Sequence, residues 1–206
     1  MSLSIRAARP DDLNVAVPML RASMGGLANY LFDDPHRTLD QYLADVYKVK
    51  GHRFSWTVSF VAEMNAEGVG YLLCYPGREL NGLQIAFLRK FPSLFGWGDT
   101  LRLIRRTWPL LNAPEADHDE FYISNVGVLP EFRRRGYGEQ LMAFAEGQAR
   151  AARLTKCSLA VDETNADAIR LYQRLGYQIV FTRRFKGRLA ELESGDHRMV
   201  KSLPAR

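Results

Sequence analysis

Hydrophobic and polar positions alternate most regularly in the last third of the chain, where they predict strands and helices in turn. Leu141, Ala145, Ala149 and Ala152 recur near helical spacing and form a narrow apolar stripe. Gly176 suits the end of a later helix, because glycine adopts the left-handed conformation there at little cost. The elements predicted here are strands at Phe121–Val128 and Cys157–Val161, helices over about Gly138–Arg153 and Asn165–Leu175 (the latter capped by Thr164), and strands near Tyr177–Arg184 and His197–Leu203.

The first part of the chain carries a weaker version of the same pattern. The residues "NAEG" between two apolar runs indicate a hairpin turn. The predicted elements are a strand at Ser4–Ala8, a helix from Asp11 or Asp12 to about Met24, a helix near Leu39–Lys48, and strands at Phe54–Met64 and Val69–Tyr75. Strands that alternate with helices after an N-terminal hairpin predict an α/β fold, a mixed sheet with helices on both faces.

Residues 76–119 interrupt this alternation as a long insertion. Asp99 is expected to cap a helix whose apolar positions are Leu101, Ile104, Trp108 and Leu111. Such a stripe must be buried against something, and three readings stay open: ordinary core, the wall of an apolar acceptor pocket, or a homodimer interface. The aromatic residues that would suit a hydrophobic or aromatic amine are Phe91, Phe95, Trp97 and Trp108.

Composition narrows the class of protein. With 206 residues the chain is long enough for one sizeable core and short for two, and 47% hydrophobic with 25% charged residues is typical of a globular protein. The net charge of +5 would suit any polyanion, and since no recognition motif is present, neither nucleic acid nor a membrane is an expected partner. Cys74 and Cys157 lack metal-ligand spacing and read as core residues of a reducing compartment. We expect no metal and a cytoplasmic location.

One turn carries candidate chemistry. The run Arg133–Gly138 reads "RRRGYG" and lies between a predicted strand and the start of a helix. Amides without partners at a helix start, glycines that allow close approach, and arginine side chains together favour a bound pyrophosphate. A dinucleotide fingerprint would need glycine where Leu141 stands, although Asp162 would suit a ribose contact, and a Walker loop is absent.

The segments "NVGVLPEFRRRGYGEQLM" and "NADAIRLYQRLGYQIV" resemble the GNAT acetyltransferase superfamily, and "FVAEMNAEGVGYLLCYP" and "IRAARPDDL" are similar to its central hairpin and first strand. The resemblance implies the acyl-CoA N-acyltransferase fold: a mostly antiparallel sheet of six to seven strands with helices on both faces and, here, a helical insertion before the cofactor-binding strand. It implies one N-acetyltransferase domain over residues 1–206, with an acetyl-CoA-binding core at about 120–184 and acetyl-CoA as cosubstrate.

The same resemblance assigns roles to individual residues. The strand before the loop would pair with the pantetheine arm, the loop would hold the pyrophosphate, and a tyrosine would protonate the departing thiolate. The positions are Val126, Gly127 and Val128 for the arm; Arg133, Arg134, Arg135, Gly136, Tyr137 and Gly138 for the pyrophosphate; Asn165 for a further cofactor contact; and Tyr172 for the catalytic acid and a cofactor contact.

The acceptor side is less determined. "DEFYISNVGV" is similar to the corresponding strand of ribosomal-protein alanine acetyltransferases, which implies Glu120 as the catalytic base; a solvated surface acid is the competing reading, and His118 is a weaker candidate. Asp33 and Asp34, in a loop at Gly25–Pro35, would attract an ammonium. The expected reaction is direct N-acetylation of a small molecule or peptide amine, and a catalytically silent acyl-CoA-binding regulator is the alternative.

Overall fold

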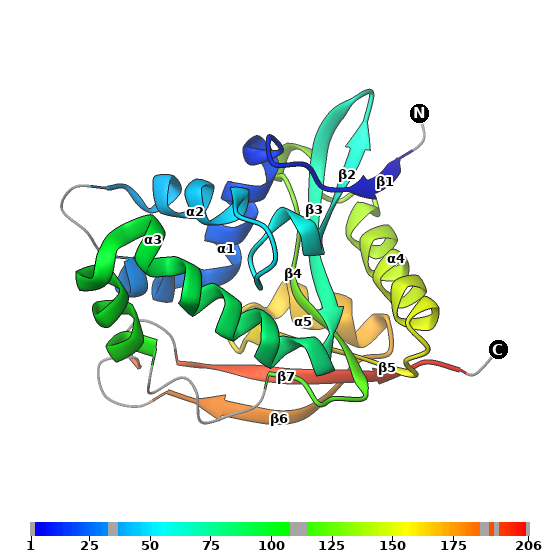
Figure 1. The fold of residues 1–206 in the computed structure, drawn as a ribbon. Coiled ribbons are helices and arrows are strands. Elements are labelled where there is room, and N and C mark those ends of the chain that lie inside the picture. Colours follow the sequence, from blue (N-terminus) through cyan, green and yellow to red (C-terminus); the bar gives the residue numbers. More distant parts are fainter. Residues whose placement is uncertain (1–2, 33–36, 108–114, 186–189, 192–193, 205–206) are drawn as a thin grey trace.

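The computed structural model describes residues 3–32, 37–107, 115–185, 190–191 and 194–204. Seven strands form one sheet in the order β1-β2-β3-β4-β5-β7-β6 (Figure 1). The strands are β1 (Ser4–Ala7), β2 (Ser59–Met64), β3 (Glu67–Pro76), β4 (Glu120–Val128), β5 (Lys156–Asp162), β6 (Gln178–Arg184) and β7 (Gly195–Ser202). All neighbouring strands are antiparallel except β4 and β5, which are parallel. The predicted fold class, a mixed and mostly antiparallel sheet, is therefore confirmed.

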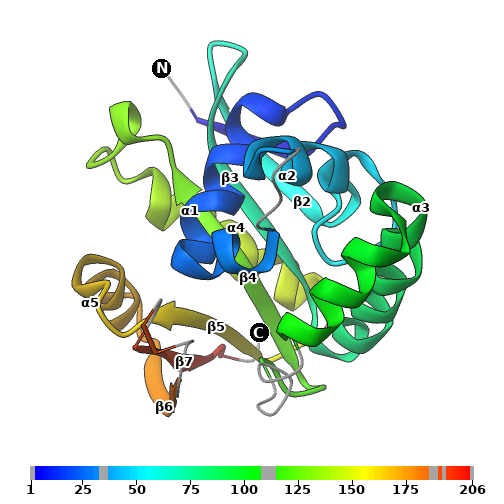
Figure 2. The same ribbon diagram turned by 90° about the vertical axis from the view of Figure 1, so that its left-hand side faces the viewer.

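Five helices cover the two faces of this sheet. They are α1 (Leu13–Phe32), α2 (Leu39–Lys48), α3 (Leu80–Thr107), α4 (Tyr137–Ala151) and α5 (Ala166–Arg174). Figures 1 and 2 show α1, α2 and α3 gathered on one side of β3 and β4, with α4 on the other. Side chains of α5 pack into the same hydrophobic cluster as those of α4. The helical insertion α3 therefore lies on the α1 side of the sheet.

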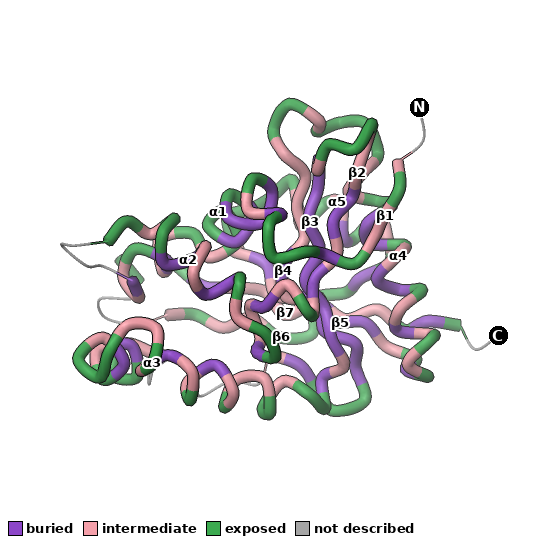
Figure 3. The backbone as a smooth tube through the Cα atoms, turned by 45° about the horizontal axis from the view of Figure 1, so that its top comes forward, coloured by how far each residue is buried: buried purple, intermediate pink, exposed green. Residues whose placement is uncertain are grey.

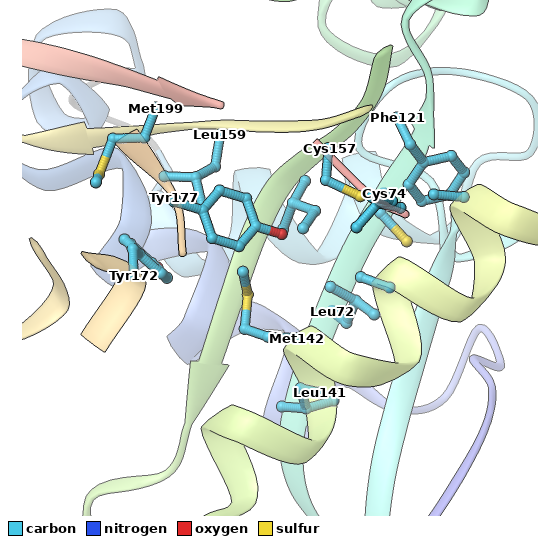
Figure 4. Packing of buried hydrophobic residues seen from close by; sticks show 14 of the residues in the cluster. Leu72, Cys74, Phe121, Leu141, Met142, Cys157, Leu159, Tyr172, Tyr177 and Met199 are labelled. Carbon is cyan, nitrogen blue, oxygen red and sulfur yellow. The ribbon is translucent and has the colours of Figure 1, made fainter. Parts of the chain in front are cut away.

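The core follows the central strands, where the backbone is most continuously buried (Figure 3). On the α4 face, the predicted stripe is buried at Leu141, Ala145 and Ala149, and Ala152 packs against it. Tyr172 and Tyr177 belong to the same cluster, with ring centroids 6.2 Å apart (Figure 4). The pattern that predicted the helix thus also predicted which face the sheet covers.

The ends of several elements differ from the prediction. The first helical segment ends at Met24, as predicted, because Gly25 has non-helical backbone angles (φ 52°), but the predicted loop that follows is helical again as far as Phe32. The strand predicted from Phe54 begins at Ser59, because residues Trp56–Val58 form a 3₁₀ turn. The cap of α5 is Asn165, whose side chain accepts a hydrogen bond from the Ala168 amide, while the Thr164 hydroxyl turns back to Asp162. A glycine or a short polar residue can interrupt or cap a helix, but its presence in the sequence does not show whether another helical segment follows.

The apolar stripe predicted for the insertion is not the face of the helix that is buried. Leu101 and Ile104 are exposed, whereas Leu103 and Thr100 are buried. Asp99 does not cap a helix start; it lies within α3 after the break at Gly96 and accepts hydrogen bonds from Tyr42 and Arg102. Of the four aromatic candidates, Phe91 is core, Phe95 stacks on Tyr42, and Trp97 is exposed, while Trp108, with Leu111 of the stripe, lies outside the described residues. The helix is apolar on several sides, so periodicity alone did not fix its buried face.

Within the described part of the chain, no helix combines the length and hydrophobicity that crossing a membrane requires.

Candidate active site

Two parallel strands separate at the centre of the sheet. β4 and β5 are paired only from Glu120 to Ile123, opposite Lys156 to Leu159. Beyond that point, β4 stays paired to β3 as far as Val128, and β5 stays paired to β7 as far as Asp162. The facing edges of β4 and β5 therefore lack ladder hydrogen bonds to each other there, and backbone groups along this edge are open to another partner.

The loop after β4 ends at an uncapped helix start. Gly136 is the N-cap of α4 in the left-handed conformation (φ 78°), and no side chain caps the helix. The first helical hydrogen bond runs from the Gln140 amide to the Gly136 carbonyl, so the amides of the preceding helical residues have no helical partner. A Cβ built on Gly136 would meet nothing within 4 Å. An anion can thus approach amides at the positive end of the helix dipole.

Three adjoining cavities follow the separation of β4 and β5. The loop cavity, about 580 Å³, is bounded by β4, the loop, and the starts of α4 and α5. The central cavity, about 470 Å³, shares Val126, Gly127, Arg133, Asn165, Ala168 and Tyr172 with it. The helical cavity, about 240 Å³, is walled by α1 and α3 and shares Ser23, Ser124, Asn125, Ala160, Val161 and Asp162 with the central cavity. Together they form a path past the separated strand ends.

The structure brings most of the predicted cofactor residues together at the loop cavity. Its walls include Val126, Gly127, Val128, Arg133, Arg134, Gly136, Tyr137, Gly138, Asn165 and Tyr172. Arg135 does not line it; its guanidinium donates to the Glu131 carbonyl and lies over the Phe132 ring. Arg133 also makes a backbone contact, donating from Nε to the Val128 carbonyl at 3.1 Å.

Tyr172 lines both the loop cavity and the central cavity. It lies about two helical turns beyond the cap Asn165, and the residue is 8% exposed. Its hydroxyl makes no hydrogen bond with the described residues, and burial raises the pKa of this phenol to about 12. The group is therefore protonated at neutral pH and can act as a proton donor in the central cavity.

The helical cavity contains a buried ion pair. Arg53 donates from two guanidinium nitrogens to the two carboxylate oxygens of Glu115, at 3.0 and 2.6 Å. Gln84 accepts a further hydrogen bond from Arg53, and the Tyr122 hydroxyl bonds to Glu115. Burial alone would raise the pKa of Glu115, but the Arg53 guanidinium outweighs burial and holds that pKa below its usual value. Both groups are therefore ionised, and their charges compensate each other.

A second charged group stands where the helical and central cavities meet. Asp162 ends β5 directly opposite Asp196 on β7, which in turn lies opposite Arg183 on β6. Arg183 Nε donates to Asp196 at 3.0 Å. One oxygen of Asp162 accepts from the Thr164 amide and hydroxyl, both at 2.7 Å, and Asp162 has no ion-pair partner among the described residues.

The acceptor-side residues predicted from the sequence lie elsewhere. Glu120 is 2% exposed and accepts hydrogen bonds from the Asp117 amide at 2.9 Å and from Arg198 at 2.6 Å. It lines none of the three cavities, and neither does the exposed His118. Asp33 and Asp34 lie outside the described residues. Glu120 as the catalytic base therefore stays a prediction.

Sequence reasoning missed the residues that form the helical cavity. Arg53 and Glu115 are 62 positions apart and belong to no motif. Asn125, whose amide donates to the Ser23 hydroxyl and links β4 to α1, had no recognisable signal beyond its place in a polar–apolar strand. Asp162 was noticed only as a ribose contact. Among the described residues, no three His, Cys, Asp or Glu side chains are grouped as a metal site would need.

Comparisons with known proteins agree with this geometry. Over 72 residues the chain is 33% identical to the uncharacterized N-acetyltransferase YycN of Bacillus subtilis, a match that covers 34% of this chain and 46% of that protein, so the chain spans about half the length of this curated relative. An N-acetyltransferase structure from Staphylococcus aureus Mu50 has a TM-score of 0.69 at 19% identity, covering 96% of this chain and 99% of the other. A GNAT family acetyltransferase structure from Elizabethkingia anophelis, with acetyl-CoA bound, has a TM-score of 0.53 at 16% identity, covering 98% of each chain.

The two structural likenesses establish the fold, and the sequence itself establishes the family. The model described as the Acetyltransferase (GNAT) family matches residues 27–177. That match includes β2 to β5, the loop at the start of α4, and α5 with Tyr172. The chain belongs to the acetyltransferase (GNAT) family.

Proposed function

We propose that this protein transfers an acetyl group from acetyl-CoA to a primary amine. The observation that carries the proposal is the row of three adjoining cavities along the separated ends of β4 and β5. Acetyl-CoA would occupy the loop and central cavities, and the amine would enter from the helical cavity. The acetyl-CoA in the Elizabethkingia anophelis relative supports the choice of cosubstrate.

The pyrophosphate of the coenzyme would bind at the start of α4. Gly136 leaves the approach to the amides open, and the exposed guanidinium groups of Arg133 and Arg134 line the same cavity. Amide donors and the helix dipole favour an anion there, and arginine adds charge-assisted hydrogen bonds. Arg135, which turns toward Phe132, would contribute through long-range charge only.

The pantetheine arm would lie along β4. The edge of this strand from Ser124 to Val128 has no partner strand on the β5 side. An extended amide-bearing chain can pair with such an edge as an added strand would. This arrangement brings the thioester to the central cavity, which Tyr172 lines.

The chemistry is a direct displacement at the thioester carbonyl. The neutral amine nitrogen forms the new C–N bond, the C–S bond breaks, and the thiolate takes the proton of the Tyr172 hydroxyl. The proton that the acylated nitrogen then loses restores the Tyr172 hydroxyl through water. Main-chain amides of β4 near Val126–Val128 would stabilise the negative charge on the carbonyl oxygen. Asn165 would act as the cap that fixes the start of α5, and hence the position of Tyr172, beside the coenzyme.

The amine must lose a proton before it can attack the thioester. The resemblance predicts Glu120, and its carboxylate is occupied by Arg198 and the Asp117 amide. For Glu120 to act as the base, water molecules would have to connect it with the amine. An alkylamine is almost wholly protonated at neutral pH, so some acceptor for this proton is required.

The reaction is tested by release of CoA thiol and by mass spectrometry of the acetylated product, with acetyl-CoA and a panel of primary amines. Calorimetric titration should give binding for acetyl-CoA and none for NADH or duplex DNA. Binding without turnover on any amine would instead support a regulator that only binds acyl-CoA. Absence of heat with acetyl-CoA would contradict both. Buried free Cys74 and Cys157 fit a reducing, cytoplasmic compartment for this activity, and a homodimer stays a prediction.

A further inference from the structure

We propose that the acceptor is a monoamine with an apolar, uncharged body, and that its ammonium group binds Asp162. This inference rests on the proposed acetyl transfer and specifies the substrate class of the helical cavity. Three observations support it: the ion pairs among the charged groups of that cavity, the position of Asp162, and the apolar side chains in the rest of the walls.

The charged groups of the helical cavity are paired with one exception. Its described walls contain two guanidinium groups, Arg53 and Arg183, and three carboxylates, Glu115, Asp162 and Asp196. Arg53 is held by both oxygens of Glu115, and Arg183 is held by Asp196. Two cations therefore meet two of the three anions, and the described walls keep one uncompensated negative charge, that of Asp162.

The register of the sheet increases the attraction of this position for a cation. Asp162 and Asp196 face each other directly across the β5–β7 ladder, where like charges destabilise a sheet. Arg183 forms its ion pair with Asp196, on the neighbouring strand. Because Thr164 engages one oxygen of Asp162 with two hydrogen bonds, the other oxygen is left to accept from a ligand. An ammonium group satisfies both the charge and the hydrogen bond.

Asp162 also lies at the place where the reaction would occur. It lines both the helical cavity and the central cavity, and Tyr172 lines the central cavity. An amine bound at Asp162 from the helical side therefore stands beside the space assigned to the thioester. Its substituent must then extend into the helical cavity, away from the coenzyme.

Apolar side chains make up about half of the walls that receive this substituent, beside Gln84, Thr107 and the paired charges. Side chains from α1, from the segment before β2, and from α3 contribute to them: Leu27, Phe32, Phe54, Phe87 and Leu103. Phe54 and Phe87 meet edge to face, with ring centroids 5.3 Å apart. A second ammonium or a carboxylate on the acceptor would enter this space without a free partner among the described residues, at a high desolvation cost. A phenylalkyl or branched alkyl group would not.

A panel of three acceptors tests the substrate class. 2-Phenylethylamine presents one ammonium and an apolar body, phenylalanine adds a carboxylate beside the same body, and spermidine has several ammonium groups. We expect kcat/KM for 2-phenylethylamine to exceed both others by at least about tenfold. A preference for spermidine or phenylalanine, in a protein that binds acetyl-CoA and turns over, would overturn this inference and leave the proposed function intact. Failure to bind acetyl-CoA would instead remove the proposed function.

Two variants test the position of the ammonium. Asp162→Asn should raise KM for 2-phenylethylamine about tenfold or more, because a charged hydrogen bond is lost, with no change in the Kd for acetyl-CoA. The matched control is Glu163→Gln, since Glu163 is the adjacent carboxylate and lines none of the cavities. An unchanged KM in Asp162→Asn, or an equal rise in Glu163→Gln, would contradict the assignment.

A third variant should alter specificity rather than remove activity. Leu27→Asp places a new carboxylate on the partly exposed α1 wall of the helical cavity. The ratio of kcat/KM for spermidine to that for 2-phenylethylamine is expected to rise at least about tenfold. If the ratio stays at its original value while acetyl-CoA still binds, the apolar wall does not exclude the second ammonium, and the inference fails.

Discussion

The Glu120 carboxylate and the Arg198 guanidinium form an ion pair at 2.6 Å, with only 3% and 15% of their side chains exposed. Glu120→Gln removes this charged hydrogen bond and leaves Arg198 with Asp117, at 2.9 Å, as its carboxylate partner, so the free energy of unfolding should fall by about 2 kcal/mol. Urea denaturation of the variant and of the exposed control Glu131→Gln measures this difference. A loss of less than about 0.5 kcal/mol, the scale of ordinary surface substitutions, would contradict the burial of the pair.

The same variant decides whether Glu120 is the catalytic base. Because Glu120 lines none of the three cavities, we expect the acidic limb of kcat/KM to persist in Glu120→Gln. The pH profile is measured at a temperature where the variant is fully folded. Loss of the limb with an unchanged KM for acetyl-CoA would establish Glu120 as the base, as the resemblance predicts.

Tyr172→Phe is expected to lower kcat by about 100-fold or more, because it removes the proton donor to the thiolate. Since burial raises the pKa of Tyr172 to about 12, its hydroxyl stays protonated throughout an assay between pH 6 and about pH 10, and no basic limb should arise from it there. The Kd for acetyl-CoA should change little.

Tyr177→Phe is the matched control for that substitution. Tyr177 is buried in the same cluster, its ring packs near that of Tyr172, and it lines none of the three cavities. Its hydroxyl meets the buried Cys157 thiol, which is a weak hydrogen-bonding group, so the variant should lose little stability and turn over normally. A similar loss of kcat in both variants would indicate a packing defect rather than a missing acid.

Gly136→Ala should weaken acetyl-CoA binding through the backbone. Gly136 has a φ of 78°, where a residue with a Cβ is strained by about 1–2 kcal/mol, so α4 would start in a different geometry. The Kd measured by calorimetry is expected to rise about tenfold. Gly147→Ala in the exposed middle of α4, where a Cβ meets nothing within 4 Å, should leave the Kd unchanged and add about 0.5–1 kcal/mol of stability. Equal Kd values in both variants would exclude the Gly136 conformation as a requirement for binding.

The Arg53–Glu115 pair predicts how stability depends on pH. The folded-state pKa of Glu115 is lowered, so its stabilising effect is fully present above the ordinary carboxylate range and is lost as the pH falls through the lowered pKa. Urea midpoints between about pH 2 and 5 should therefore fall less steeply in Glu115→Gln than in the unmodified protein. An identical slope in the two proteins would show that Glu115 titrates normally.

The coenzyme side of the site could be predicted from sequence because its determinants are local. The loop from Arg133 to Gly138 and the cap Asn165 lie within a few residues of the helix starts that they shape. Because such residues are close together in the chain, they can be recognised as a sequence motif. The mixed sheet with helices on both faces also followed from the alternation of apolar positions, whereas the order of its strands did not.

The acceptor side could not be predicted because its residues converge only in the folded chain. Arg53 and Glu115 come from segments on either side of α3, and nothing in either segment points to the other. In α3 itself, apolar residues occur on several faces, so the sequence did not distinguish the buried Leu103 from the exposed Leu101 and Ile104. Which face packs was determined by the break at Gly96 and by contact with α1 and α2.

The four residue pairs that join β4 to β5 have a mechanical consequence. They are the ladder between two parts of the sheet, β1 to β4 and β5-β7-β6, so direct strand pairing joins these two parts over four residues of each strand. A coenzyme lying along β4 and touching α5 would contact both parts and would stabilise their relative position while it is bound. Amide hydrogen exchange in β5, β6 and β7 should then slow on addition of acetyl-CoA, well beyond the residues that touch it.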